Sequence, residues 1–314
     1  MVSRRFVWLA AALLAVACAG PQVRRTAPER FRAHAAAAEA GLLHYPAAGP
    51  HVLVVGAPGL SPALFDVPGF GGLAPYLQHE GFDVWVIDWR DAPLTAGLAE
   101  LGALAHGMAA EINADHRGLS LVAHSLGGVA WLAHDGAPPV DRYVFLAVPG
   151  SLRAPLDPVA DFAKASWSGP HSLREAATLY EGVKTDRLLL TDLLWSYGAA
   201  PLDPARYERL YQPVGEPLLN ELTAAIRAEA WPAQVTASLA ALRSPVRVFV
   251  GQTDGLAPTW QTFETYRRAG SPDKHYRFVG RANGDHREYG HLSLLAGEGA
   301  AREVFPLVGA ALEN

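Results

Sequence analysis

The chain has 314 residues, of which 50% are hydrophobic and 18% are charged, and its formal net charge is −5. This composition supports a large folded core and excludes a disordered chain. Because the net charge is mildly negative and no block of lysine and arginine occurs beyond the N-terminus, we expect no nucleic-acid partner. The length alone allows one or two domains.

The N-terminal segment combines two arginines, an apolar stretch and the single cysteine of the chain. Arg4 and Arg5 precede residues 6–19, which are too few for a membrane span of roughly 20 residues but suit the core of a signal peptide. Small residues surround Cys18 in AVACAG. This pattern is similar to a bacterial lipoprotein signal, although Ala15 stands where leucine is usual.

We therefore expect residues 1–19 to be a signal peptide, with lipidation of Cys18 anchoring the protein in the bacterial cell envelope. An ordinary secretory signal, which would leave a secreted or periplasmic protein, and an uncleaved anchor stay open as alternatives. The polar, alanine-rich residues 20–45 are interpreted as a tether or lead-in.

From His51 onward, apolar runs alternate with helical patterns. Alternation of this kind predicts the α/β class, with a mostly parallel sheet flanked by helices. The apolar runs are typical of strands buried on both faces. The predicted strands lie within 51–59, 82–90, 119–125, 140–150, 245–255 and 275–280, and the predicted helices within 73–81, 96–116, 126–136 and 300–314.

Residues 151–242 interrupt this alternation. They have helical patterns, contain no convincing strand and are too many for a loop. We expect them to form a helical cap, inserted into a core made of residues 46–150 and 243–314. Most aromatic residues of the cap should form its own core, and some are expected to line an apolar substrate pocket.

A serine lies between a predicted strand and a predicted helix in LVAHSLGG, residues 121–128. This order is the one that a nucleophile elbow requires, with Ser125 on a tight, strained turn. Side chains two positions before and after the serine crowd each other there, and Ala123 and Gly127 are small enough to fit. A purely structural turn is the alternative.

A nucleophilic serine needs a general base, and the base needs a carboxylate that orients it. Asp254 follows a late predicted strand, at the carboxyl edge where open α/β sheets form their sites. An ordinary Asp-Gly turn is the alternative for Asp254. Two histidines, His286 and His291, lie in the loop before the final helix, and both qualify as the base.

The Ser125 elbow, GQTDGLAP around Asp254 and the ending YGHLSLLAGEGAAREVFPLVGAAL together resemble the α/β-hydrolases. The ending is similar to that of the acid-lipase-like branch, which implies that His291 is the base, although Ser293 replaces the usual aspartate. FDVWVIDWRD is similar to a strand of polyhydroxyalkanoate synthases, which use a cysteine nucleophile. The resemblance implies the α/β-hydrolase fold for the core and does not cover the cap.

The resemblance also implies an oxyanion hole made of backbone N–H groups. Leu126, directly after the serine, should supply one donor. Leu60 should supply the other, with Pro58-Gly59 in the place of the His-Gly of lipases. His124 adjoins the serine but points elsewhere at an elbow, so we interpret it as a packing residue.

These residues predict a serine hydrolase that cleaves carboxylic esters, with a small-molecule or lipid-like ester as substrate. No metal-ligand spacing and no phosphate-binding glycine motif occurs, so we expect no metal and no organic cofactor. Two alternatives stay open. One is an acyltransferase or polyester-related enzyme with the same triad, and the other is a non-catalytic envelope lipoprotein that binds a hydrophobic ligand.

Overall fold

A computed structural model describes residues 28–33, 40–67, 71–153, 171–172, 210–297 and 299–313. The expected signal peptide with Cys18 and most of the expected cap lie outside the described residues. None of the described helices has the length and apolar character that crossing a membrane requires.

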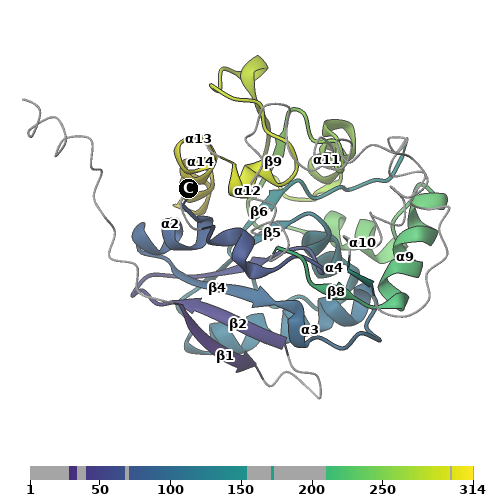
Figure 1. Cartoon of the computed structure of the whole chain (residues 1–314), viewed down its shortest axis with the longest axis horizontal. Helices are drawn as coiled ribbons and strands as arrows, with labels where there is room; N and C mark the ends of the chain where they lie inside the picture. Colours follow the sequence, from purple (N-terminus) through teal and green to yellow (C-terminus); the bar gives the residue numbers. More distant parts are fainter. Residues whose placement is uncertain are drawn as a thin grey trace, which may run out of the picture.

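An eight-stranded sheet runs through the middle of the molecule (Figure 1). Its strand order is β1-β2-β4-β3-β5-β6-β9-β10. The β1–β2 and β2–β4 pairs are antiparallel and all other neighbours are parallel, which confirms the predicted mostly parallel sheet. The strands are β1 (Glu29–Ala33), β2 (Ala40–Tyr45), β3 (His51–Val55), β4 (Asp83–Asp88), β5 (Leu119–His124), β6 (Arg142–Leu146), β9 (Val246–Gly251) and β10 (Lys274–Val279), with β7 (His171–Ser172) and β8 (Pro213–Val214) forming a separate ladder.

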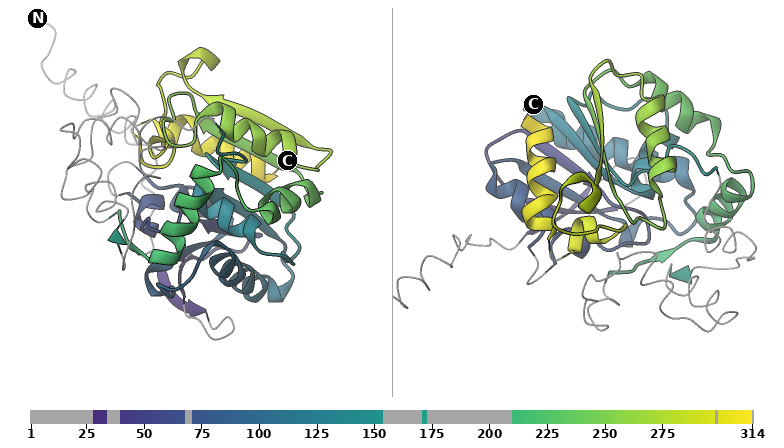
Figure 2. Two further views of the ribbon diagram at one scale, coloured as in Figure 1. Left: turned by 90° about the vertical axis from the view of Figure 1, so that its right-hand side faces the viewer. Right: turned by 90° about the horizontal axis from the view of Figure 1, so that it is seen from above.

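Helices cover both faces of the sheet. The helices α2, α12, α13 and α14 pack on one face, and α3, α4, α9, α10 and α11 pack on the other (Figure 2). The helix bounds are α2 (Leu73–His79), α3 (Leu98–Ile112), α4 (Leu126–Ala133), α9 (Glu216–Arg227), α10 (Ala233–Ala241), α11 (Thr259–Arg268), α12 (Ser293–Ala296), α13 (Ala300–Glu303) and α14 (Phe305–Glu313). Short 3₁₀ turns span Pro62–Phe65, Trp89–Asp91, Asn113–Asp115 and Arg281–Asn283.

The central strands are apolar on both sides because both sides are covered. In β3, Val52 and Val54 belong to the core under α2 and α14, whereas Leu53 and Val55 belong to the core under α3 and α4. All four side chains are fully buried. Side chains of a strand alternate between its faces, so a continuous apolar run serves two cores at once.

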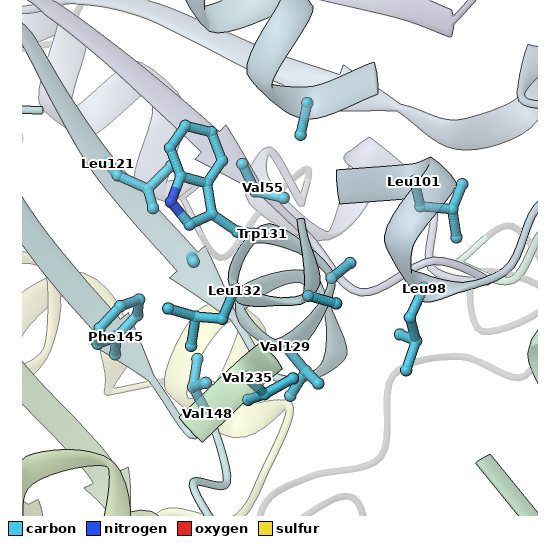
Figure 3. Packing of buried hydrophobic residues seen from close by; sticks show 14 of the residues in the cluster. Val55, Leu98, Leu101, Leu121, Val129, Trp131, Leu132, Phe145, Val148 and Val235 are labelled. Carbon is cyan, nitrogen blue, oxygen red and sulfur yellow. The ribbon is translucent and has the colours of Figure 1, made fainter. Parts of the chain in front are cut away.

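The helix α4, which directly follows Ser125, is held firmly in one of these cores. Leu132 of α4 lies toward Phe145 of β6, and Trp131 lies toward Leu121 of β5, all within one buried cluster (Figure 3). The helix α4 also contacts α3. Because close-packed cores resist displacement, the residues at the start of α4 have a rigid support.

Two of the domain boundaries predicted from the sequence need correction. Residues 29–33 and 40–45, which we expected within a tether or lead-in, form β1 and β2 at the antiparallel edge of the sheet. The helix α10, which we expected in the cap, packs against α4 and α11 through the core, where Val235 and Leu239 are buried. Composition alone could not separate these short elements from their alanine-rich surroundings.

Candidate active site

Three predicted site residues meet at the carboxyl edge of the sheet. Ser125 directly follows β5, and Asp254 comes three residues after the end of β9. His291 lies in the segment between β10 and α12. Because β5 and β9 run in the same direction, their carboxyl ends lie at the same edge, where α/β sheets form clefts.

The backbone at Ser125 has the strained geometry of a tight strand-to-helix turn. Its φ is 53° and its ψ is −130°, a backbone conformation that residues other than glycine rarely adopt. The Ser125 N–H donates to the Leu146 carbonyl at 2.9 Å, which fixes the turn to β6. At Gly127, a Cβ atom would overlap the carbonyl oxygens of Val55 and Gly56, so only glycine fits there.

A continuous line of hydrogen bonds joins the three side chains. The His291 Nε2 lies 2.7 Å from the Ser125 Oγ, and the His291 Nδ1 lies 2.9 Å from the Asp254 Oδ2. The other Asp254 oxygen accepts the N–H groups of Leu256 at 2.9 Å and Ala257 at 2.7 Å. All three side chains are buried, with 8% or less of each residue exposed. The arrangement can therefore move a proton from the hydroxyl to the imidazole.

The segment that carries His291 is packed tightly against the end of β9. The Tyr289 carbonyl accepts both the N–H and the Oγ–H of Thr253, and it leaves no space for a Cβ atom at Gly251. The Gly290 N–H donates to the Ser293 Oγ at 2.7 Å. Ser293 thus supports the turn beside His291.

His286, the other candidate base, lies in a different environment. Its side chain is 93% exposed, and its Nδ1 is 2.6 Å from the Glu303 Oε1. The second Glu303 oxygen accepts the Tyr289 hydroxyl at 2.6 Å. His286 and Glu303 therefore fasten the outside of the loop, and it is His291 that the structure brings to Ser125.

His124 lies behind the candidate base. Its fully buried ring is centred 4.8 Å from the His291 ring, and its Nε2 lies 3.3 Å from the His291 carbonyl, to which it can donate. Burial, with a smaller contribution from the charge of His291, lowers the pKa of His124 well below its usual range. A neutral, buried ring in this position acts as packing for the base.

The expected oxyanion donors differ in their availability. The Leu60 N–H donates to the Ala57 carbonyl at 3.0 Å, closing a turn with Pro58 second and Gly59, whose φ is 90°, third. Pro-Gly at these positions is the signature of a type II turn, which engages the fourth N–H. Leu126 begins α4, where an N–H has no acceptor within the helix.

Ala57 offers a further backbone N–H in this loop, which sequence reasoning did not consider. Ala57 is buried and follows the end of β3 by two residues, and the preceding carbonyl lies against Gly127 of the elbow. The turn and loop hydrogen bonds of the described residues include none from the Ala57 N–H. The Pro-Gly turn was the available signal, because it already engages the Leu60 amide.

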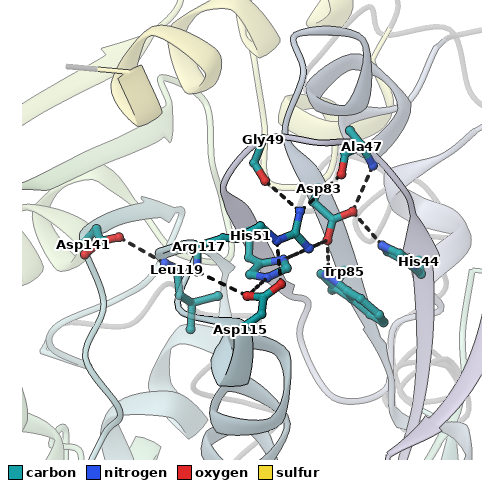
Figure 4. A network of polar contacts seen from close by, with 10 residues as sticks. All are labelled: His44, Ala47, Gly49, His51, Asp83, Trp85, Asp115, Arg117, Leu119 and Asp141. Carbon is teal, nitrogen blue, oxygen red and sulfur yellow. Dashed lines mark hydrogen bonds and ion pairs between the residues drawn. The ribbon is translucent and has the colours of Figure 1, made fainter.

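A second buried Asp–His cluster occupies the amino edge of the same sheet (Figure 4). His51 begins β3, and its ring nitrogens lie 2.8 Å from an Asp83 oxygen and 2.8 Å from an Asp115 oxygen. Asp83 begins β4 and also contacts His44 at 2.8 Å and Arg117 at 3.3 Å. The residues drawn in this network include no serine, threonine or cysteine beside the histidines.

This network favours the ionised form of Asp83. Burial alone would raise the pKa of Asp83. Hydrogen bonds from the Ala47 N–H, His44 and the Trp85 indole outweigh burial, and the pKa is lowered from its ordinary value. This cluster joins β2, β3 and β4 at one edge. Across the described ranges, no group of three histidine, cysteine, aspartate or glutamate residues is placed to hold a metal ion.

Comparison with known proteins identifies the fold. No family model and no curated protein sequence matches the chain. Among solved structures, a membrane phospholipase A described as a bacterial virulence factor has a TM-score of 0.62 and 17% identity, covering 99% of this chain and 98% of that chain. A soluble variant of monoglyceride lipase from Saccharomyces cerevisiae has a TM-score of 0.57 and 15% identity, covering 93% and 96%.

A third similar structure is named for a peptidase rather than for a lipase. The proline iminopeptidase-related protein from Thermus thermophilus has a TM-score of 0.57 and 20% identity, covering 92% of this chain and 98% of that chain. At these identities the likeness shows the α/β-hydrolase fold, as the resemblance implied. Because one fold serves many reactions, the reaction has to be argued from the site itself.

Proposed function

We propose that this protein is a serine hydrolase that cleaves carboxylic esters through an acyl-enzyme. The observation that carries the proposal is the line of hydrogen bonds from the Ser125 Oγ through the His291 ring to the Asp254 carboxylate. A structural turn would need neither the strained backbone at the serine nor the histidine 2.7 Å from its hydroxyl.

The proposed reaction begins when the Ser125 Oγ attacks the ester carbonyl carbon while the His291 Nε2 takes the hydroxyl proton. Asp254 holds the imidazole in the required tautomer and stabilises the imidazolium. The tetrahedral intermediate collapses, and the alcohol leaves with the proton from His291. Water then attacks the acyl-enzyme with His291 as its base, which releases the acid and restores Ser125.

The negative oxygen of the intermediate needs donors that are not already engaged. We assign this role to the N–H groups of Leu126 and Ala57, because the Leu60 N–H donates to Ala57 within the turn. Loss of one such donor typically lowers kcat by about 10²–10³-fold. The assignment replaces our expectation that Leu60 is the second donor.

A lipid-like ester is the substrate class that we propose. Two of the similar structures are named as a phospholipase A and a monoglyceride lipase, which supports this class without fixing it. Lipidation at Cys18 would keep the enzyme at the membrane of the cell envelope. A Cys18→Ser variant should then lose incorporation of radiolabelled palmitate, whereas incorporation as in the wild type argues against lipidation at Cys18.

Replacement of the nucleophile tests the proposed function. Ser125→Ala should abolish labelling by a fluorophosphonate and lower kcat for p-nitrophenyl acyl esters by about a millionfold, as removal of a triad serine does elsewhere. Ser120→Ala, which changes another buried serine on β5, is the matched control and should retain both signals. Labelling that persists in Ser125→Ala would disprove the assignment.

The same assay separates the two histidines. His291→Ala should lose activity nearly as completely as Ser125→Ala, because both act on the same proton. His286→Ala should stay within about threefold of the wild type, since its ring contacts Glu303 at the surface. An inactive His286→Ala with an active His291→Ala would reverse the assignment of the base.

A further inference from the structure

A buried tryptophan holds the loop that follows β3. Trp89 belongs to the 3₁₀ turn Trp89–Asp91 after β4, the strand that pairs with β3. Its indole Nε1–H donates to the Gly56 carbonyl at 2.8 Å, and this contact is buried. Only 5% of Trp89 is exposed, so the contact lies in the interior beside the elbow loop.

The contact fixes the direction of a neighbouring N–H. The Gly56 carbonyl and the Ala57 N–H belong to one peptide group, and every peptide bond in the described residues is trans. In a planar trans peptide the C=O and the N–H point in opposite directions. A donor that holds the carbonyl therefore also sets where the Ala57 N–H points, and it polarises that N–H.

A second contact holds the other end of the loop. The Gln212 N–H donates to the Gly59 carbonyl at 2.8 Å, and the Gln212 Nε2 donates to the Asp88 Oδ1 at 2.6 Å. Asp88 directly precedes Trp89, and both Asp88 and Gln212 are buried. The end of β4 and the turn after it thus support the loop, at Gly56 directly through Trp89 and at Gly59 through Gln212.

We propose that Trp89 is a positioning residue for the oxyanion hole: its indole holds the Gly56–Ala57 peptide so that the Ala57 N–H faces the developing oxyanion. Gln212 and Asp88 support the far end of the same loop. The inference rests on the proposed function, because it assigns the Ala57 N–H to the intermediate. It adds a role for Trp89, which contacts neither substrate nor triad in the mechanism above.

Trp89→Phe removes the indole donor and keeps an aromatic ring. The kcat for p-nitrophenyl esters should fall about 10- to 100-fold, somewhat less than after loss of a whole donor, with KM within about twofold. Affinity for a trifluoromethyl ketone, whose adduct places an oxyanion in the hole, should fall in parallel. A merely structural role would leave the ratio of inhibitor affinity to KM unchanged.

The chain offers a matched control. The indole of Trp231 donates to the Pro149 carbonyl at 2.7 Å and is also buried, but that carbonyl lies outside the loop. Trp231→Phe should keep the kcat and the inhibitor affinity within about twofold of the wild type. If the two variants lose inhibitor affinity equally, or if Trp89→Phe loses none, the positioning role is wrong.

Two further measurements decide the question if Trp89→Phe folds poorly or the wild type proves inactive. Gln212→Met removes the side-chain donor to Asp88 and should lower the affinity for the trifluoromethyl ketone about three- to tenfold. Unchanged affinity contradicts the proposed support of the loop by Gln212.

Hydrogen exchange does not require an active enzyme. The backbone N–H groups within residues 56–60 should exchange faster in Trp89→Phe or Gln212→Met than in the wild type. Unchanged exchange overturns the proposal, whereas an unlabelled, inactive wild type overturns only the proposed function.

Discussion

The carboxyl edge and the amino edge of the central sheet each hold a buried Asp–His pair, and only the pair at the carboxyl edge lies beside a nucleophilic side chain. At the carboxyl edge, Asp254 and His291 are 2.9 Å apart. At the amino edge, Asp83 and His51 are 2.8 Å apart and equally buried (Figure 4). Neither the residue types nor the distance distinguishes the two pairs.

The difference lies in what the rest of each pair contacts. The second nitrogen of His291 meets the hydroxyl of Ser125, whereas the second nitrogen of His51 meets the carboxylate of Asp115. Arg117 adds a further ion pair to Asp83. A buried Asp–His pair can therefore have either a structural or a catalytic role. A nucleophilic side chain beside the second nitrogen of the histidine indicates the catalytic role.

The largest expected effect that separates the two pairs is on activity. Asp254→Asn should lower kcat about 10⁴-fold, because the amide NH₂ would donate to the His291 Nδ1 and leave the Nε2 protonated and unable to accept the serine proton. Asp83→Asn should stay within about threefold at a temperature where it is folded. Ester hydrolysis by the two purified variants measures this, and comparable losses in both would remove the distinction.

The effect on folding should have the opposite order. Asp83→Asn leaves His44, His51 and Arg117 without their shared carboxylate, and removal of one partner from a buried ionic cluster costs about 3 kcal/mol. Asp254→Asn keeps an oxygen for the Leu256 and Ala257 N–H groups and should change the free energy of unfolding by less than about 1 kcal/mol. Urea unfolding near neutral pH compares the two, and a larger loss in Asp254→Asn contradicts the structural role of Asp83.

The smallest expected effect is a pH dependence of this stability difference. The pKa of Asp83 is lower in the folded state than the ordinary value of 3.8, so ionisation of Asp83 stabilises the folded state. That contribution is complete above 3.8 and is lost as the pH falls through the lower folded pKa. Urea unfolding at a series of pH values measures the difference in free energy of unfolding between the wild type and Asp83→Asn. This difference should become smaller only below pH 3.8. A difference that becomes smaller toward high pH would contradict the stabilising role of the ionised Asp83.

The sequence predicted best where apolar periodicity and local turn chemistry coincide. Buried strands such as β3 and β5 are continuous apolar runs, and the small residues around Ser125 follow from crowding at a tight turn. The choice between His286 and His291 needed a family resemblance, because both lie in one loop. The contact between His286 and Glu303 that separates them depends on how that loop folds back.

Other features depended on contacts that are distant in sequence. The cluster at the amino edge joins His51, Asp83 and Asp115, which lie on different segments that only the sheet brings together. The donor that we propose at Ala57 was not predicted from the sequence, because the loop was interpreted by analogy with lipases rather than from its own Pro-Gly turn, which engages the Leu60 N–H. Short strands such as β2 lack the length that makes a periodic pattern visible.

The backbone angle at Ser125 has a consequence for laboratory evolution. A φ of 53° is a conformation that glycine adopts freely and serine adopts only under strain. Selection of random variants for heat resistance alone would therefore favour glycine at this position and enrich well-folded but inert chains. A screen for more thermostable variants of this protein therefore has to select for catalytic activity in the same step.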